Sequence, residues 1–366
     1  MLELKRKELG LQKRLTNETF KFDERYGNGF FSASYFLKTE KIIKEKFPET
    51  YVTMQWFTRK ESRLCGIDEA IALLHTFARN PQNLKIEALN DGDYVSPMEP
   101  VLKVHGRYQD FGYLEGAIDG ILARRTSVCT NCDEIMKAKS ANSAVMFFGD
   151  RDDDPRNHPG DGYAAYVAGV KLVCTDAMGE WTGQKGIGTM PHALIVMHEK
   201  DLIKASEDYH ATFPEDNLTV LVDTNNDVIT DTLLIARHFK ETLWGVRLDT
   251  SISLEDKYFE RNPVTDKSID THGVNVTLVK ALRKALDDEG FNHVKIVVSS
   301  GFSVEKVKQF TAENTPVDTY GIGGSLIKCT RSFTGDVVNI NGKPMAKVGR
   351  AEMFSDRLEE VKFPIR

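Results

Sequence analysis

Short apolar segments alternate with amphipathic helical segments through the second part of this 366-residue chain. From about Val145 onward, each apolar segment ends in a polar residue or a glycine. Strands that alternate with helices form parallel βαβ units, and continuously apolar strands are covered on both faces. The pattern predicts an irregular α/β barrel, with a doubly wound open sheet as the alternative. The apolar segments are "VMFFGDR", "VKLVCTDA", "KGIGTMPH", "LTVLVDT", "TLWGVRLDT", "VKIVVSSG" and "VDTYGIGG".

The first third of the chain has a mixed α/β pattern. "SASYFLKTEKIIKEKF" carries apolar residues at helical spacing, and "YVTMQWFTRK" alternates like a half-buried strand. "LKIEALNDGDYVSPMEPVLKVHGRY" indicates three strands with a turn at "NDGD". A long, mostly helical stretch is predicted after these strands.

Charge and hydropathy exclude two classes of partner. The net charge of −6 argues against binding to nucleic acid or to a membrane surface. No apolar run approaches the roughly 20 residues of a membrane helix. The amino-terminal "MLELKRKELGLQKRL" is basic but lacks the apolar core of a signal peptide. We therefore expect a cytoplasmic protein.

Polar residues and glycines end the predicted strands. In an α/β barrel, the chemistry lies at the carboxyl ends of the strands. These residues are therefore expected to share one rim and to form the functional site. They are Arg151, Asp176, His192, Asp223, Arg247, Asp249, Ser300, Gly301, Gly323 and Gly324.

Two glycine-containing loops follow the last two strands. Glycine permits positive φ and close approach of a ligand to the backbone, and a loop that enters a helix offers free N–H groups to an anion. Each loop is expected to lead into a helix, with Ser303 as the cap of the first. The sequence therefore predicts a phosphate site here, although tight packing turns explain the same glycines.

Arg247 and Asp249 are two residues apart in one strand, so their side chains point the same way. Charged side chains inside a barrel need a partner or a ligand. Asp223 ends the preceding strand, and a carboxylate pair suits Mg²⁺ or ribose hydroxyls. A helix cap is the alternative role for Asp223.

Two further positions complete the candidate site. The aromatic residue before Arg151 at a strand end favours stacking and charge pairing with a planar acid. His192, in "GTMPHAL", is by itself most often a structural residue.

With these motifs in order, the sequence resembles the nicotinate phosphoribosyltransferase family, which is related to the nicotinamide and quinolinate phosphoribosyltransferases. The strongest part is "GVRLDT", "VKIVVSSGFSVEKVKQF" and "VDTYGIGGSL", and "GTMPHAL", "LVDT", "DGDYVSPMEPVLKVHG" and "FFGDR" support it. The resemblance covers nearly the whole chain, from about Tyr26 to Lys347.

The resemblance implies two domains and a shared site. Residues 1–120 would form an α/β sandwich to which residues 335–366 return, and residues 121–334 would form the irregular, TIM-like barrel. It also implies an obligate homodimer, or a higher oligomer, with active sites between subunits. The implied reaction joins nicotinate to phosphoribosyl pyrophosphate (PRPP) and gives nicotinate mononucleotide and pyrophosphate in NAD salvage. Mg²⁺ would be required, and ATP is a possible co-substrate.

The resemblance also implies a role for each matching residue. Phe148 would stack on the pyridine ring, Arg151 would lie near its carboxylate or the phosphates, and Asp176 would line the base pocket. Tyr35 of the partner subunit would close the ring from the other side.

At the PRPP site, Arg247 and Asp249 match the family's Arg-x-Asp, and Asp223 would hold Mg²⁺ or the ribose. His192 matches the histidine that ATP-coupled members phosphorylate. The 5′-phosphate would lie on Ser300, Gly301, Gly323 and Gly324.

Three segments depart from the family pattern, and all three are expected on the substrate rim. They are "TSIS" after Arg-x-Asp, Phe302 after Ser-Gly, and "DRDDDPR" in place of Arg-Arg. The same chemistry on nicotinamide or quinolinate, and a catalytically reduced homologue that only binds nucleotides, are therefore alternatives. A phosphate-binding lyase of the aldolase type is disfavoured because no lysine stands at a strand end.

Overall fold

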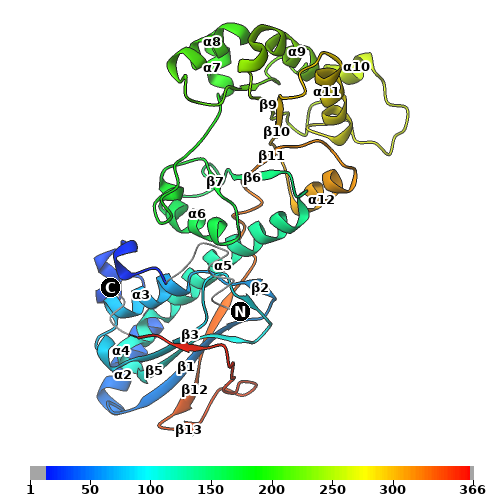
Figure 1. Cartoon of the computed structure of the whole chain (residues 1–366). Helices are drawn as coiled ribbons and strands as arrows, with labels where there is room; N and C mark the ends of the chain where they lie inside the picture. Colours follow the sequence, from blue (N-terminus) through cyan, green and yellow to red (C-terminus); the bar gives the residue numbers. More distant parts are fainter. Residues whose placement is uncertain (1–13, 363–366) are drawn as a thin grey trace. The chain divides into compact units, whose positions relative to one another are not determined.

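The computed structural model describes residues 14–362 and divides the chain into two units (Figure 1). One unit contains the chain up to Asp133, Pro159–Gly169 and the segment from Ile327 onward. The other contains Glu134–His158 and Val170–Leu326. Most of the basic amino-terminal segment, which was predicted not to be a signal peptide, lies outside the described residues. So do residues 363–366 of the predicted returning segment.

The first unit contains a six-stranded antiparallel sheet with the order β13-β12-β1-β5-β3-β14. Its central strand β1 pairs with β12, although nearly 300 positions separate the two in sequence, as in the pair Val52 and Ile340. A separate two-stranded ribbon pairs β2 with β4. The strands are β1 (Tyr51–Thr58), β2 (Ser62–Arg63), β3 (Lys85–Ala88), β4 (Tyr94–Val95), β5 (Pro100–Arg107), β12 (Phe333–Ile340), β13 (Lys343–Pro344) and β14 (Glu359–Glu360).

Helices bury their apolar sides with this sheet in one core. Trp56, Leu64, Ile71 and Tyr113 belong to it, each at most 1% exposed. The long helix α5 confirms the predicted helical stretch, and the predicted boundary at residue 120 lies within it. The helices that begin in this part of the chain are α2 (Ser34–Lys46), α3 (Ile67–Phe77), α4 (Tyr108–Phe111), α5 (Glu115–Ala138) and α6 (His158–Val167).

Strand β1 is more deeply buried than its alternating sequence predicts. Every residue from Val52 to Thr58 is buried, because a carboxyl-terminal segment is hydrogen-bonded to the sheet's polar side. The Gln55 side chain donates to the carbonyl of Ala351 at 3.0 Å and accepts from the Met353 backbone N–H at 2.9 Å. The prediction of a half-buried strand was wrong because this distant segment satisfies a polar residue that would otherwise face water.

Two carboxyls one turn apart on α5 make the stability of this unit depend on pH. Burial raises the pKa of Glu115 to about 8, and Asp119 and Asp336 raise it further. Burial also raises the pKa of Asp119 to about 7, against the lowering effect of Trp56, and Asp336 raises it further. The unfolded chain therefore releases the Glu115 proton near pH 4.5, while the folded chain holds it to about pH 8. The free energy of unfolding therefore falls as the pH rises from about 4.5 to about 8. Below this range the group causes no loss of stability, because it is protonated in both states.

Glu115→Gln is therefore expected to raise the free energy of unfolding by about 1–3 kcal/mol at pH 9. At pH 4 we expect no change, because the carboxyl is protonated in both states. Urea unfolding at the two pH values measures the difference. Glu134→Gln, an exposed position on the same helix, is the control. An equal effect at both pH values would contradict the prediction.

The second unit contains a six-stranded parallel sheet with the order β7-β6-β11-β10-β9-β8. This confirms the mixed α/β class and the parallel sheet. The order is that of a barrel opened between β7 and β8, since β11 pairs with β6. Among residues 14–362 no pairing joins β7 to β8, so a closed barrel stays a prediction. The strands are β6 (Ala144–Phe147), β7 (Leu172–Val173), β8 (Thr219–Leu221), β9 (Gly245–Leu248), β10 (Lys295–Val298) and β11 (Thr319–Ile322).

Helices connect these strands. Helix α12 begins where predicted, with the Ser303 side chain accepting from the backbone N–H of Lys306 at its amino-terminal cap. The helix predicted after Gly324 is absent, since a turn closes there with the Leu326 N–H donating to the Gly323 carbonyl at 2.8 Å. The chain then continues to β12. The connecting helices are α7 (His192–Met197), α8 (Leu202–Thr212), α9 (Val228–Phe239), α10 (Lys257–Arg261), α11 (Val276–Asp288) and α12 (Val304–Ala312).

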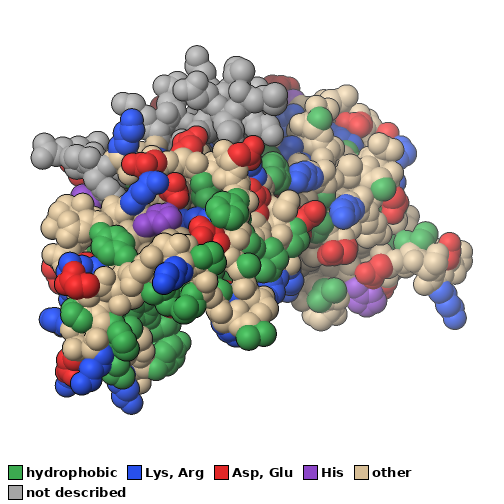
Figure 2. All heavy atoms as spheres, turned by 90° about the horizontal axis from the view of Figure 1, so that it is seen from below, with side chains coloured by type: hydrophobic (Ala, Val, Ile, Leu, Met, Phe, Trp, Pro, Cys, Tyr) green, Lys and Arg blue, Asp and Glu red, His purple; other side chains and the backbone are tan. Residues whose placement is uncertain are grey.

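The surface shows no simple charge pattern on the side drawn in Figure 2. Over its described part, acidic and basic side chains are interspersed, with hydrophobic side chains gathered between them. Among residues 14–362, no helix has the length and apolar content needed to cross a membrane.

Candidate active site

The carboxyl ends of the six parallel strands lie at one edge of the second unit's sheet. Arg247 lies within β9 and Asp249 follows it directly, while Asp223 lies two residues after β8. The two glycine loops follow β10 and β11, and Phe148 follows β6. Nearly all of the sequence-predicted residues therefore belong to loops at this edge.

Arg247 is the central cation of this edge. Burial lowers its pKa, Asp249 and Asp223 raise it, and Arg151 lowers it further. The guanidinium Nη2 lies 3.5 Å from the Met190 carbonyl, while the buried Nε has no hydrogen-bond partner. An arginine with an unused donor and a second cation nearby is suited to bind an anion that carries several charges.

Asp223 is the buried carboxylate beside this cation. Burial raises its pKa to about 6, against the lowering effect of His192, and Asp249 raises it further. Its Oδ1 atom is buried without a hydrogen-bond partner. This oxygen lies 3.7 Å from Nε2 of His192, so the two groups face each other across a short gap.

Asp249 is held by a residue that the sequence analysis did not single out. The hydroxyl of Ser299 donates to Oδ1 of Asp249 at 2.7 Å and lies 3.1 Å from the Leu248 carbonyl. Ser299 is 3% exposed. Its position was a usable indication of this role, because Ser299 directly follows β10 and Asp249 directly follows the neighbouring strand β9.

His192 begins helix α7, and its ring is anchored on one side only. Nδ1 lies 3.0 Å from the hydroxyl of Thr224. Nε2 faces Asp223, and the side chain is 43% exposed. The histidine therefore presents one ring nitrogen toward the candidate site and toward solvent.

Phe148 packs directly against Gly321 of strand β11. A Cβ atom on Gly321 would lie 2.5 Å from Cε2 of Phe148, so only glycine leaves room for the ring. The Arg247 guanidinium carbon is 6.0 Å from the ring centroid, within reach of a cation–π contact. The ring thus stands beside the cation, as stacking of a planar acid requires.

Space requires glycine at Gly323, while at Gly324 a Cβ would only touch a side chain. A Cβ on Gly323 would lie 2.4 Å from the Phe148 carbonyl oxygen, and one on Gly324 would lie 3.1 Å from a carboxylate oxygen of Asp152. Neither glycine has a positive φ. The sequence predicted that these glycines let a ligand approach the backbone closely. In the structure, the groups that lie against them are Phe148 and Asp152.

The loop after β10 is conformationally unusual. Ser300 and Gly301 have φ angles of 72° and 67°, and residues other than glycine rarely adopt such angles. Phe302 then turns inward, is 4% exposed, and packs on Phe310 and Tyr320. The expectation that Phe302 lies on the substrate rim was wrong, because its ring fills the core below the loop.

Two further predicted residues make local contacts. Asp176 is exposed, and its Oδ1 accepts the Gly186 backbone N–H at 2.9 Å, which fastens the loop after β7. Tyr35 belongs to helix α2 of the first unit, where it is 62% exposed and contacts Phe36.

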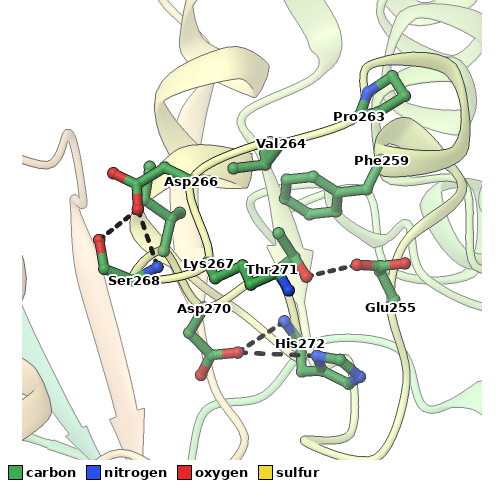
Figure 3. Close-up of a pocket in the computed structure, with 11 residues that line it drawn as sticks. Glu255, Phe259, Pro263, Val264, Asp266, Lys267, Ser268, Asp270, Thr271 and His272 are labelled. Carbon is green, nitrogen blue, oxygen red and sulfur yellow. Dashed lines mark hydrogen bonds and ion pairs between the residues drawn. The ribbon is translucent and has the colours of Figure 1, made fainter.

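The second unit also contains a cavity of about 600 Å³ near α10. None of the sequence-predicted residues lines it. Figure 3 shows its acidic side chains already bonded to neighbours: Asp266 to Ser268, Glu255 to Thr271 and Asp270 to His272. The cavity is lined by Glu255, Phe259, Pro263, Val264, Asp266, Lys267, Ser268, Ile269, Asp270, Thr271 and His272.

The donor set fits a metal ion only in part. In residues 14–362, no three His, Cys, Asp or Glu side chains gather as a group that could hold a metal by themselves. The unpartnered Oδ1 of Asp223 and the carboxylate of Asp249 do fit Mg²⁺, which commonly takes one or two carboxylates and completes its shell with water and phosphate oxygens.

Comparisons with known proteins agree with this architecture. Residues 34–126 match the family model for the quinolinate phosphoribosyl transferase N-terminal domain. The chain is 24% identical over 250 residues to nicotinate phosphoribosyltransferase of Bacillus subtilis, which covers 66% of this chain and 45% of that protein. It is 24% identical over 272 residues to nicotinate phosphoribosyltransferase pncB1 of Mycobacterium tuberculosis, which covers 72% and 55%. The chain thus spans about half the length of the curated relatives it matches.

Solved structures show the same fold. Nicotinate-nucleotide pyrophosphorylase from Pyrococcus furiosus is 29% identical, with a TM-score of 0.78 over 93% of this chain and 82% of that one. Human nicotinic acid phosphoribosyltransferase is 15% identical, with a TM-score of 0.64 over 86% and 75%. The second likeness shows the fold alone.

Proposed function

We propose that this chain, which is similar to nicotinate phosphoribosyltransferases, transfers the phosphoribosyl group of PRPP to nicotinate. The products are nicotinate mononucleotide and pyrophosphate, a reaction of NAD salvage. One observation carries the proposal: the half-buried Arg247 interacts with two carboxylates, Asp223 and Asp249, and lies beside the ring of Phe148. The names of the relatives support the choice of nicotinate.

The bond from C1′ to pyrophosphate breaks with positive charge developing on the ribose and negative charge on the leaving group. Arg247, with its unused Nε–H, and Arg151 supply positive charge to the departing pyrophosphate. The Phe148 face holds the pyridine ring so that its nitrogen lone pair points at C1′. No general base is needed, because that nitrogen carries no proton to remove.

The carboxylates act on the ribose side. Asp249, which Ser299 orients, and Asp223, whose Oδ1 has no hydrogen-bond partner, would bind the ribose hydroxyls or a Mg²⁺ ion. When bound, Mg²⁺ neutralises pyrophosphate oxygens and lowers the cost of their separation from C1′. The loops of Ser300–Gly301 and Gly323–Gly324 would receive the 5′-phosphate.

We propose that His192 is the residue through which ATP acts on this reaction. Its Nδ1 is anchored on Thr224 while Nε2 faces Asp223 and solvent. Nε2 is the nitrogen that would accept the terminal phosphoryl group of ATP, with ADP leaving, and this step would make nucleotide formation more favourable.

Two further residues, Tyr35 and Asp176, would complete the ring pocket. We propose a homodimer in the cytoplasm, in which the exposed Tyr35 of one subunit closes the ring pocket of the other. Asp176 would line the same pocket from the loop after β7.

Product formation from PRPP and Mg²⁺ tests the function directly, with nicotinate, nicotinamide or quinolinate as acceptor and with or without ATP. We expect nicotinate mononucleotide from nicotinate alone. ATP is expected to increase this turnover, and His192→Ala to remove the increase while leaving the ATP-independent rate within about twofold. ATP stimulation that survives in His192→Ala would contradict the assigned histidine.

Quinolinate is the second candidate, because the matching family model is that of the quinolinate enzymes' N-terminal domain. The acidic segment Asp152–Asp154 disfavours an acceptor with two carboxylates. Turnover of quinolinate would reverse this order. PRPP binding without turnover of any acceptor would instead indicate a catalytically reduced homologue.

A further inference from the structure

A negative charge already lies against Gly323 and Gly324, the two glycines after β11 that we call the glycine cradle. A Cβ placed on Gly323 or on Gly324 would in each case lie 3.1 Å from Oδ2 of Asp152. The carboxylate oxygen therefore rests against the backbone of both glycines. This is the surface to which the proposed function assigns a phosphate of the substrate.

The position of Asp152 follows from how its loop is attached. The Phe148 backbone N–H donates to the Ile322 carbonyl at 2.7 Å, so the start of the loop continues the pairing of β6 with β11. Gly323 lets the Phe148 carbonyl approach the chain closely. Four residues later the loop returns, and Asp152 comes to rest on the glycines.

Little holds the carboxylate in that place. Within residues 14–362, no hydrogen bond or ion pair joins the Asp152 side chain to another group, and the residue is exposed. Its neighbour differs in this respect, because Asp153 accepts from the Asp154 N–H at 2.7 Å and from the Asn157 amide at 3.2 Å. Asp152 can therefore leave the cradle without breaking a bond.

We propose that Asp152 is a displaceable carboxylate that occupies the phosphate cradle of the free protein and sets its affinity for phosphate monoesters. The inference rests on the proposed function, which assigns this cradle to the 5′-phosphate. A phosphate must displace Asp152 and then bind near a like charge, and both effects weaken its binding. Asp152 thereby disfavours simple phosphates relative to a substrate that also reaches Arg247.

Binding of ribose 5-phosphate, measured by calorimetry in metal-free buffer, tests the proposal. Asp152→Asn and Asp152→Ala are each expected to tighten binding by about tenfold or more, because two unit charges about 4 Å apart interact appreciably even in water. Asp153→Asn is the matched control, since it removes the same charge one residue away and should change the affinity less than about threefold. Equal affinity of wild type and both Asp152 variants, or weaker binding by them, would overturn the proposal.

The two proposals fail in different ways. If wild type forms nicotinate mononucleotide but the Asp152 variants bind ribose 5-phosphate like wild type, only the role of Asp152 is wrong. If the variants bind ribose 5-phosphate more tightly but no acceptor is turned over, only the proposed reaction is wrong. Binding of ribose 5-phosphate by neither the wild type nor the variants would show that the cradle does not bind a phosphate monoester and would overturn the role of Asp152, while the product assay would still decide the proposed reaction.

Discussion

Arg247→Ala is expected to lower kcat/KM for nicotinate mononucleotide formation by about 10²–10³-fold. The side chain is a half-buried cation that interacts electrostatically with Asp249 and Asp223, and its buried Nε–H has no hydrogen-bond partner among the described residues. Its removal takes positive charge from the departing pyrophosphate and leaves two carboxylates facing that anion. Steady-state kinetics with PRPP and nicotinate measure the loss.

Two further variants make this result interpretable. Arg247→Lys keeps the charge but loses the planar fork, so we expect an intermediate loss. Arg237→Ala removes an exposed arginine that pairs with Glu289 on the helix surface, and its kinetics should match wild type. An Arg247→Ala protein that unfolds like wild type and retains full kcat/KM would refute the assigned role.

Gly323→Ala is expected to disturb both the fold and the site. The new Cβ would lie 2.4 Å from the backbone carbonyl oxygen of Phe148, and a backbone atom cannot rotate away as a side chain can. Overpacking of this kind costs about 1–3 kcal/mol of stability. Because Phe148 and the cradle would shift together, we also expect kcat/KM to fall by about 10²-fold.

Thermal unfolding and kinetics of the same preparation check both parts of this prediction. Gly120→Ala is the matched control, because a Cβ there meets nothing within 4 Å and the residue lies inside helix α5. It should be as stable as wild type or more stable by about 0.5–1 kcal/mol. Wild-type stability and activity in Gly323→Ala would mean that the two loops do not pack as described.

Local sequence determined which segments become strands and which residues end them. The run that ends in "GVRLDT" forms β9, with Arg247 inside the strand and Asp249 directly after it. This part was predictable because a strand buried on both faces needs a continuous apolar run, and a charged residue within it then signals a site. Ser303 was likewise predictable as a helix cap, because a side-chain oxygen there satisfies a free N–H of the first turn.

Other features depended on contacts that no local pattern contains. Gly321, Gly323 and Gly324 precede a turn and not a helix. Phe148, more than 160 positions earlier, requires glycine at Gly321 and Gly323, and the Asp152 side chain lies against Gly324. Phe302 lies in the core because Phe310 and Tyr320 receive its ring. Gln55 is buried because a carboxyl-terminal segment satisfies its amide.

The sequence by itself thus determined the alternation of strands and helices, the charged ends of the strands and, through its motifs, the resemblance to a family. The tertiary structure decided which groups face one another: Asp223 with His192, Asp249 with Ser299, and Asp152 with the glycine cradle. The physical reason is that periodicity and capping are properties of neighbouring residues. Burial, charge pairing and steric room depend instead on what the rest of the chain brings to each position.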